Sequence, residues 1–259
     1  MDYTELGVTC KIPEESNDYN GASDFVVTHI CSIIGQAISS GNNRIFIRTN
    51  LKRGLPIENI NKVAGPFVEA WAMEQFECIA DEVGNIYDLI HAEPGKRLAP
   101  YDIILQFRRR YNGTDYVSAA VDVKATAEDI VTSGRSPNIT SYARIRSEYL
   151  NDADYIFVIL SLKHKVFSEK APETGMTNGI MEVVSCAAYD LKYISPQDIS
   201  YNPALGTGQL QIRDIHYVSI GPRTTWEFCQ LLDDKFVRSR GESEWLKMAR
   251  KFKWVKEDE

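Results

Sequence analysis

An aspartate and a lysine stand two positions apart in the stretch AVDVKAT, where they are Asp122 and Lys124. Residues two apart on a strand lie on the same face, so these two side chains would be neighbours. Such a pair can be an ordinary ion pair, worth at most about 1 kcal/mol on a surface. It can also be half of a metal-dependent active site. On spacing alone the ion pair is the simpler interpretation, because Asp-x-Lys is common by chance.

A predicted β-hairpin carries a second carboxylate toward this pair. Residues 101–107 and 116–126 both alternate in polarity as strands do, and Asn112-Gly113 between them is a strong hairpin signal. Asp102 stands at the start of the first strand, whereas the Asp-x-Lys pair stands near the end of the second. The hairpin therefore brings the two ends of the segment, and their polar side chains, to the same edge.

The register of the hairpin decides whether the two carboxylates meet. A turn centred on residues 112–114 would pair Asp102 with Lys124 and would place Asp122 within diagonal reach on the same face. A strict two-residue turn would pair Asp102 with Val123 and would put the Asp-x-Lys pair on the other face. The sequence thus permits convergence without requiring it.

Two converging carboxylates beside a lysine suit metal-dependent hydrolysis of a phosphodiester. Mg²⁺ prefers oxygen ligands, keeps several waters and needs one or two protein carboxylates. The ion neutralises charge on the scissile phosphate and lowers the pKa of water. The lysine is a point charge that can orient the attacking water or stabilise the transition state. We therefore keep a Mg²⁺ site as the functional interpretation.

A predicted helix before the hairpin, at about 64–82, carries three further acids. Glu69 shares a face with apolar side chains one, two and three turns further on, and an acid on such a face needs a partner or a metal. Glu74 also has apolar neighbours, and Glu77 lies on the same helix. Periodicity does not choose among these glutamates, and a solvated helix glutamate is the alternative for each.

Composition narrows the class of protein. The chain has 259 residues, enough for one large or two small domains with a buried core. Its five cysteines form no C-x-x-C motif and its four histidines are dispersed, which disfavours zinc sites and disulfides and favours a reducing, cytoplasmic location. The apolar run 155–162 is too short to span a membrane, and the acidic N-terminus lacks the apolar region of a secretory signal. We therefore expect no membrane association.

Net charge does not decide the partner. The formal charge of −7 argues mildly against nucleic acid, but a cation-binding site itself requires carboxylates. Basic residues also gather locally, at 51–54, 108–110, 143–146 and 163–165. Each cluster can equally be solvated surface.

The remaining elements complete an α/β pattern. Residues 23–40 are predicted to form an amphipathic helix with Ser23 as N-cap and Gly41 as its stop. Pro66 suits the first position of the helix at 64–82. Further elements are expected as a strand at 44–50, a helix at 141–150, a buried strand at 153–164 and a basic helix at 243–254. This order predicts an α/β core with a central mixed β-sheet flanked by helices.

This order of elements, with its motif residues, resembles the PD-(D/E)XK nuclease superfamily. The family's first acid lies in a Pro-x-Asp setting, matched here by residues 100–102, and its D/E-x-K matches residues 122–124. Longer blocks between about Arg44 and Leu232 resemble type II restriction endonucleases more closely. They include TNLKRGLPIENINKVAGPFVEAWA, SPNITSYARIR and DISYNPALGTGQLQIRDIHYVS. The resemblance selects Glu69 as the helix acid and implies a restriction-endonuclease-like fold.

The resemblance implies a Mg²⁺-dependent homodimer that cuts double-stranded DNA at a short palindrome, GTTAAC, and leaves blunt ends. Asp102 and Asp122 would hold the metal, together with Glu69 and the carbonyl of Val123, and Lys124 would assist catalysis. A companion DNA methyltransferase is expected, because an unprotected host genome would be cut. The expected organisation is one domain over 1–259, with dimerisation at about 1–42, the catalytic core at about 60–165 and DNA recognition at about 195–235.

Two polar segments have side chains suited to reading bases, since Asn and Gln pair with adenine and Arg pairs with guanine. The first, 134–141, offers Arg135, Asn138 and Thr140 at the opening of a predicted helix. The second, 202–209, offers Asn202, Ala204, Thr207 and Gln209, with Gly206 and Gly208 allowing the backbone to approach a groove. Ordinary Asx-rich turns are the alternative for both segments.

Three basic residues are weaker candidates for DNA contact. Lys52 and Arg53 would suit phosphates or the minor groove, and Lys163 would suit a backbone phosphate beside the site. Two other functions remain open from the residues. A repair or structure-specific nuclease would use the same core but follow DNA shape. A non-catalytic DNA-binding module on the same fold is disfavoured, because all three motif residues are present.

Overall fold

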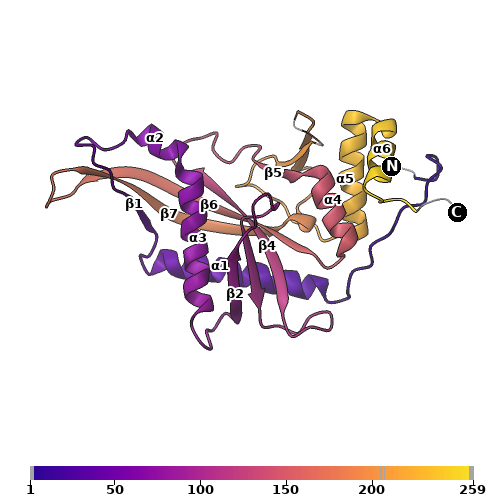
Figure 1. Ribbon diagram of the computed structural model, residues 1–259, viewed down its shortest axis with the longest axis horizontal. Coiled ribbons are helices and arrows are strands. Elements are labelled where there is room, and N and C mark those ends of the chain that lie inside the picture. The colour runs from indigo at the N-terminus through magenta and orange to yellow at the C-terminus, as the bar shows by residue number, and fades with distance from the viewer. Residues whose placement is uncertain (1–2, 205, 207, 257–259) are drawn as a thin grey trace. The chain divides into compact units, whose positions relative to one another are not determined.

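The structure is a computed structural model that describes residues 3–204, 206 and 208–256 (Figure 1). Its helices are α1 (Tyr19–Ser39), α2 (Ile57–Lys62), α3 (Ala64–Ala80), α4 (Tyr142–Asn151), α5 (Thr225–Arg240) and α6 (Glu242–Lys251), with a 3-10 turn at Leu191–Tyr193. Its strands are β1 (Arg44–Ile47), β2 (Leu89–Pro94), β3 (Ile103–Phe107), β4 (Val117–Ala127), β5 (Asn138–Ser141), β6 (Ile156–Lys170), β7 (Thr177–Asp190), β8 (Ile199–Asn202) and β9 (Gln209–Ile212).

The chain forms two compact units. Unit 1 contains the residues up to Ser23, those from Arg135 to Phe157, and those from Asp190 onward. Unit 2 contains Asp24–Gly134 and Val158–Tyr189. The predicted hairpin and the preceding helix both belong to unit 2, whereas the two segments suited to reading bases lie almost wholly in unit 1.

Unit 2 is built on a six-stranded sheet in the order β1-β7-β6-β4-β3-β2. Its β3 and β4 are antiparallel. The amide of Glu128 donates to the carbonyl of His164 and the hydroxyl of Thr126 to that of Leu162, so residue numbers rise together along β4 and β6. The sheet is therefore mixed, as the sequence predicts. The long β6 and β7 extend beyond the other strands beside β1, and α3 packs against β2 and β4 (Figure 1).

Unit 1 combines α4, α5 and α6 with a three-stranded antiparallel sheet in the order β5-β9-β8. A buried ion pair lies in its core, where Arg146 and Asp233 are both fully buried and their Nε and Oδ1 atoms are 3.2 Å apart. The hydroxyl of Tyr142 donates to the same Oδ1 at 2.6 Å. Hydrogen bonds from α4 thus satisfy the buried carboxylate on α5, as a buried charge requires.

Two details of the predicted helices are wrong. α1 begins at Tyr19 rather than after Ser23, and Ser23 is a buried helical residue that donates to Asp190 at 2.7 Å. Pro66 is the third residue of α3, still within the first turn, where a helix needs no amide donor. The expected stop at Gly41 is confirmed, because Gly41 has φ 79° two residues after the last residue of the helix.

Helix α1 has the length and apolar composition of a membrane span, although no such run was expected from the sequence. Core helices of globular proteins meet the same test. Val26, Ile30 and Ile34 on α1 are fully buried, and Phe25 packs edge-on against Phe107 of β3. In the described residues the apolar face of α1 is therefore a core face.

Candidate active site

The β3–β4 hairpin has the predicted turn, but its register is neither of the two that the sequence permits. Asn112 and Gly113 both have positive φ, 45° and 80°, as a tight hairpin turn requires. Beyond the turn the pairing shifts by one residue, and Ile103 lies opposite Val121. The observed register therefore differs from both that the sequence permits, which pair Asp102 with Lys124 or with Val123. Asp102 lies directly before β3, and its main-chain partner on β4 is Val121, whose carbonyl accepts from the Asp102 amide.

Asp102 is fixed by both of its neighbouring strands. Its amide donates to the carbonyl of Val121 at 2.9 Å, and its Oδ2 accepts from the amide of Val123 at 2.8 Å. On the other side its carbonyl accepts from the amide of Gly95 at 2.6 Å. One oxygen of the carboxylate thus bonds the backbone of β4, and the residue lines the cleft described below.

Asp122 is a buried carboxylate with one unsatisfied oxygen. Its Oδ1 accepts from Nζ of Lys124 at 2.8 Å, and the residue is only 4% exposed. No described residue donates to its Oδ2, which is itself buried. Burial raises the pKa of Asp122 to about 7; Lys124 acts in the opposite direction, while Asp102 and Glu69 raise it further. Such a group is expected to gain a cation or a proton.

The structure distinguishes the helix glutamates. Glu69 and Glu74 of α3 line a cleft of about 540 Å³ together with Asp102. Glu69 is half-buried, whereas Glu74 is exposed. Burial raises the pKa of Glu69, the Asp102 carboxylate adds to this, and Lys124 lowers it. Glu69 thus shares one electrostatic environment with the hairpin residues.

The residues present fit a hard divalent cation. The described part of the chain holds no group of three or more His, Cys, Asp or Glu side chains arranged as a metal centre. Two carboxylates suffice for an ion that keeps most of its waters, however. The unsatisfied Oδ2 of Asp122 and its clustering with Asp102 and Glu69 leave excess negative charge that one lysine does not balance. A bound cation would give Oδ2 of Asp122 a partner and would balance the excess negative charge.

The segment 134–141 is only partly available for contact with DNA. Residues 138–141 form strand β5 rather than a loop opening a helix. Arg135 and Asn138 are exposed, but Thr140 is buried at 5% exposure, so the expectation that it reads a base is wrong. The Oδ1 of Asn138 accepts from Nε2 of Gln211 at 2.9 Å. Sequence reasoning missed Gln211, although the alternation in QLQIR could have indicated it.

The segment 202–209 joins β8 to β9. Ala204 is exposed, and its amide donates to Oδ1 of Asn202 at 3.0 Å, so an Asx turn is present. Gln209 is half-buried at the start of β9. Thr207 lies outside the described residues. The candidates that can be placed here sit at one end of the β8–β9 pair.

Comparisons with known proteins agree with this chemistry. The family model described as "Type II restriction endonuclease HpaI" matches residues 7–253. The type II restriction enzyme HpaI of Haemophilus parainfluenzae is 50% identical over 259 residues, which cover 99% of this chain and all of the relative. This chain belongs to the HpaI family of type II restriction endonucleases. A solved structure, the NlaIV restriction endonuclease, aligns over 85% of each chain with 12% identity and a TM-score of 0.44.

Membership of the HpaI family identifies the chain as a site-specific deoxyribonuclease that acts on double-stranded DNA. The predicted superfamily resemblance is confirmed at family level. A repair nuclease and a non-catalytic binding module are correspondingly disfavoured.

The three basic residues that are weaker candidates for DNA contact lie away from the acidic residues of the candidate active site. Lys52 and Arg53 are exposed on the loop between β1 and α2. Lys163 is half-buried on β6. None of the three lines the cleft beside Glu69 and Asp102. Contact with the DNA backbone therefore remains their expected role.

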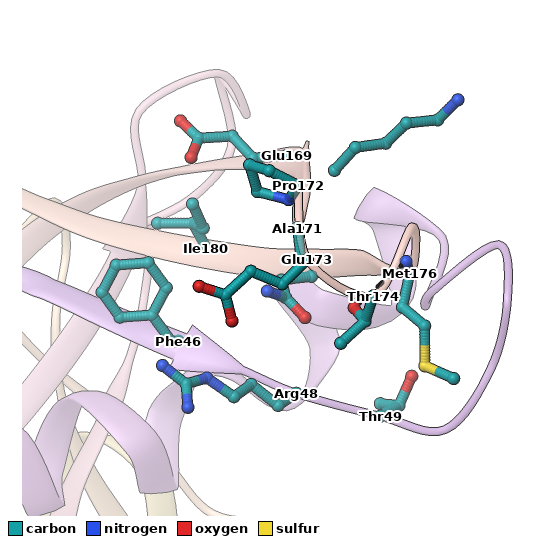
Figure 2. Close-up of a pocket in the computed structure, with 12 residues that line it drawn as sticks. Phe46, Arg48, Thr49, Glu169, Ala171, Pro172, Glu173, Thr174, Met176 and Ile180 are labelled. Carbon is teal, nitrogen blue, oxygen red and sulfur yellow. Dashed lines mark hydrogen bonds between the residues drawn. The ribbon is translucent and has the colours of Figure 1, made fainter.

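A second hollow, of about 450 Å³, lies between the end of β1 and the β6–β7 hairpin (Figure 2). Arg48 and Glu173 reach toward it beside Phe46, so its lining mixes both signs of charge with an aromatic ring. None of the candidate catalytic residues lines it. The hollow is therefore separate from the candidate active site.

Proposed function

We propose that this enzyme is a Mg²⁺-dependent homodimer that cleaves double-stranded DNA within GTTAAC and leaves blunt ends. The proposal is supported by the 50% identity with HpaI over the whole chain and by the sequence blocks noted above. The observation that carries the chemistry is the buried Asp122 carboxylate, whose Oδ2 lacks a donor among the described residues. Asp102 and Lys124 stand beside it.

Asp102 and Asp122 would hold the ion, with Glu69 and the Val123 carbonyl as further ligands. When bound, Mg²⁺ neutralises charge on the scissile phosphate and makes a water molecule easier to deprotonate. The chain itself supplies the fixed geometry. The amide of Val123 orients the Asp102 carboxylate at 2.8 Å, and the backbone of β4 carries Asp122 and Lys124 on the same strand. Such preorganisation is a main source of catalytic rate.

Lys124 supplies positive charge at a defined point. Its Nζ is held by Oδ1 of Asp122 at 2.8 Å, and its side chain is about one fifth exposed. From there it can orient the attacking water and stabilise negative charge that develops on the phosphate. Water attacks phosphorus in line, the bond from phosphorus to the 3′ oxygen breaks, and the products are a 5′-phosphate and a 3′-hydroxyl.

The β5-β9-β8 sheet of unit 1 would read the DNA sequence. Asn138, whose Oδ1 accepts from Gln211, would present its amide to an adenine. Further base contacts are proposed for Arg135, Asn202, Ala204, Thr207 and Gln209, and phosphate contacts for Lys52, Arg53 and Lys163. The core at about 60–165 would provide catalysis and the region at about 195–235 recognition, within one functional domain spanning 1–259.

A two-fold dimer fits a palindrome, because each subunit would then cut one strand. Residues at about 1–42 are proposed to contribute to the dimer interface. A companion DNA methyltransferase would protect the same site in the host, and the pair would act in the cytoplasm.

The experiment is digestion of a fully sequenced plasmid with Mg²⁺ and mapping of every end, using the wild type, Asp122→Ala and Lys124→Ala. Lys165→Ala is the matched control, because Lys165 pairs with Glu182 at 2.8 Å and lies outside the cleft. Blunt cuts at GTTAAC that the two site variants abolish and the control retains would support the proposal. Cuts at another palindrome would reject the site but keep the mechanism. Wild-type cutting by Asp122→Ala would reject the mechanism.

A further inference from the structure

Asp102 depends on a glycine that belongs to neither strand of the catalytic hairpin. Gly95 directly follows β2, and its amide donates to the carbonyl of Asp102 at 2.6 Å. The adjoining register pairs Pro94 with Ile103. The Asp102 peptide is therefore held between the end of β2 on one side and β4 on the other. Gly95 also lines the cleft that contains Glu69 and Asp102.

A side chain at position 95 has no room. A Cβ built there would lie 2.3 Å from the carbonyl oxygen of Tyr101 and 3.2 Å from both the carbonyl carbon and the oxygen of Asp102. These are backbone atoms, which cannot swing aside as the end of a long side chain can. Gly95 is not among the glycines with positive φ, so the requirement is for space and not for an unusual backbone conformation.

We propose that Gly95 is a positioning residue for the Asp102 carboxylate. Its lack of a side chain lets the end of β2 close onto the Tyr101–Asp102 peptide, which keeps the Asp102 carboxylate within reach of the Val123 amide on β4. The inference rests on the proposed role of Asp102 as a metal ligand. A methyl group at position 95 would push the peptide by several tenths of an ångström or more, and displacement of about 1 Å costs about 100-fold in rate at such sites.

The test is Gly95→Ala, compared with the wild type, Asp102→Ala and the control Gly221→Ala. A Cβ at Gly221 would meet its nearest atoms at 3.6 Å, which is ordinary contact, and its φ is not in the left-handed region. The measurements are the melting temperature, binding of duplex DNA in EDTA, and single-turnover cleavage with Mg²⁺. Binding of Mn²⁺ is followed separately by the electron paramagnetic resonance signal of the free ion.

For Gly95→Ala we expect cooperative melting and DNA binding in EDTA like those of the wild type. Cleavage should fall by about 10- to 100-fold, and Mn²⁺ binding should weaken in the same direction as in Asp102→Ala. Gly221→Ala should match the wild type in all four measurements. Loss of both metal binding and cleavage with DNA binding retained is the signature of a displaced ligand.

The outcomes separate this inference from the proposed function. If Asp102→Ala still cleaves DNA and binds Mn²⁺ normally, the proposed metal site is wrong. If Asp102→Ala is inactive but Gly95→Ala binds Mn²⁺ and cleaves like the wild type, the role of Gly95 is wrong. If Gly95→Ala neither melts cooperatively nor binds DNA, the inference is also overturned, because Gly95 would then serve the fold as a whole.

Discussion

The Nζ atom of Lys124 donates to Oδ1 of Asp122 at 2.8 Å, while Oδ2 of the same carboxylate is buried and receives no hydrogen bond from a described residue. The ion pair suggested by the spacing therefore exists, but it satisfies only half of the carboxylate. Burial without a second hydrogen-bond donor destabilises the ionised form of the carboxylate. The two interpretations of the Asp-x-Lys pair are thus compatible, since the lysine occupies one carboxylate oxygen and leaves the other without a partner among the described residues.

The first prediction concerns the pH dependence of stability without metal. The pKa of Asp122 is about 7 in the folded protein and 3.8 when unperturbed, so the folded state binds more protons between these values. Its contribution is fully present below pH 3.8 and is lost as pH rises through about 7, by at most about 4 kcal/mol. Asp122→Asn should remove this loss and should be more stable than the wild type at pH 8 in EDTA. Urea unfolding of both proteins from pH 5 to 8 gives the free energy of unfolding at each pH. The same pH dependence in the two proteins would contradict the prediction.

The second prediction concerns Lys124. Lys124→Ala should reduce single-turnover cleavage by about 100- to 1000-fold, the typical cost of losing one charge-stabilising group. DNA binding in EDTA should persist, because Lys124 is not one of the residues proposed to contact DNA. The same variant should make the metal-free protein less stable at pH 8, since Lys124 lowers the pKa of Asp122 in the wild type. Unchanged cleavage alongside Lys165→Ala would show that the pair is structural.

The third prediction separates two glutamates on one helix. Glu69 is half-buried and interacts electrostatically with Asp102 and Lys124, whereas Glu74 lines the same cleft but is exposed. Glu69→Gln should lower metal affinity or cleavage by about 10- to 100-fold, as is usual for groups that support a metal site. Glu74→Gln is the matched control and should remain within a few-fold of the wild type. A larger effect in Glu74→Gln would reverse the assignment. Mn²⁺ titration together with cleavage rates provides the measurement.

The fourth prediction concerns base recognition by Asn138. Because Gln211 donates to its Oδ1 at 2.9 Å, Gln211→Met should free the Asn138 amide to rotate while keeping the side-chain volume. Discrimination against one substituted base pair should weaken by about 1–3 kcal/mol. Gln106→Met, at a half-buried position of β3 where the side chain donates to Ser118 at 3.2 Å, is the control. Cleavage rates on GTTAAC and on singly substituted duplexes would decide. Equal discrimination by both variants would exclude a reading role for the Asn138–Gln211 pair.

The fifth prediction concerns stability of unit 1. Asp233→Ala should cost about 3–5 kcal/mol, because it leaves the fully buried Arg146 without its counter-charge. The exposed pair of Glu244 and Lys247 gives the contrast, and Glu244→Ala should cost at most about 1 kcal/mol. Urea titration of both variants measures the difference. Similar losses would mean that Arg146 finds another partner.

Local signals in the sequence were sufficient for the hairpin but not for its register. Asn112-Gly113 adopts the positive φ values that its residue types favour, and this is a property of two neighbouring residues. The pairing of Asp102 depends instead on how the whole loop 108–116 closes, where one residue changes the partner. The register depends on packing between strands of the sheet, and local residue patterns in one sequence do not determine that packing.

The DNA-reading candidates show the same limit. Asn138 is polar and exposed, as its type suggests, but Thr140 is buried by the fold of β5 against β9. Glu69 was chosen over Glu74 by resemblance, since both have apolar neighbours along the helix. The difference in exposure arises from where the helix meets the hairpin. The alternation in QLQIR could have placed Gln211 on a strand face, but its hydrogen bond to Asn138 depends on how β5 pairs with β9.

The register of the hairpin also limits the changes in loop length that this family can accept. Side chains on a strand alternate between its two faces, so the loop 108–116 sets the phase of the catalytic strand as well as connecting it. An insertion or deletion there that passed into β4 would exchange Asp122 for an apolar neighbour on the active face. The length of the loop would then determine which face of β4 carries the catalytic side chains. Substitutions in the loop would be tolerated, whereas a change in its length by an odd number of residues would not.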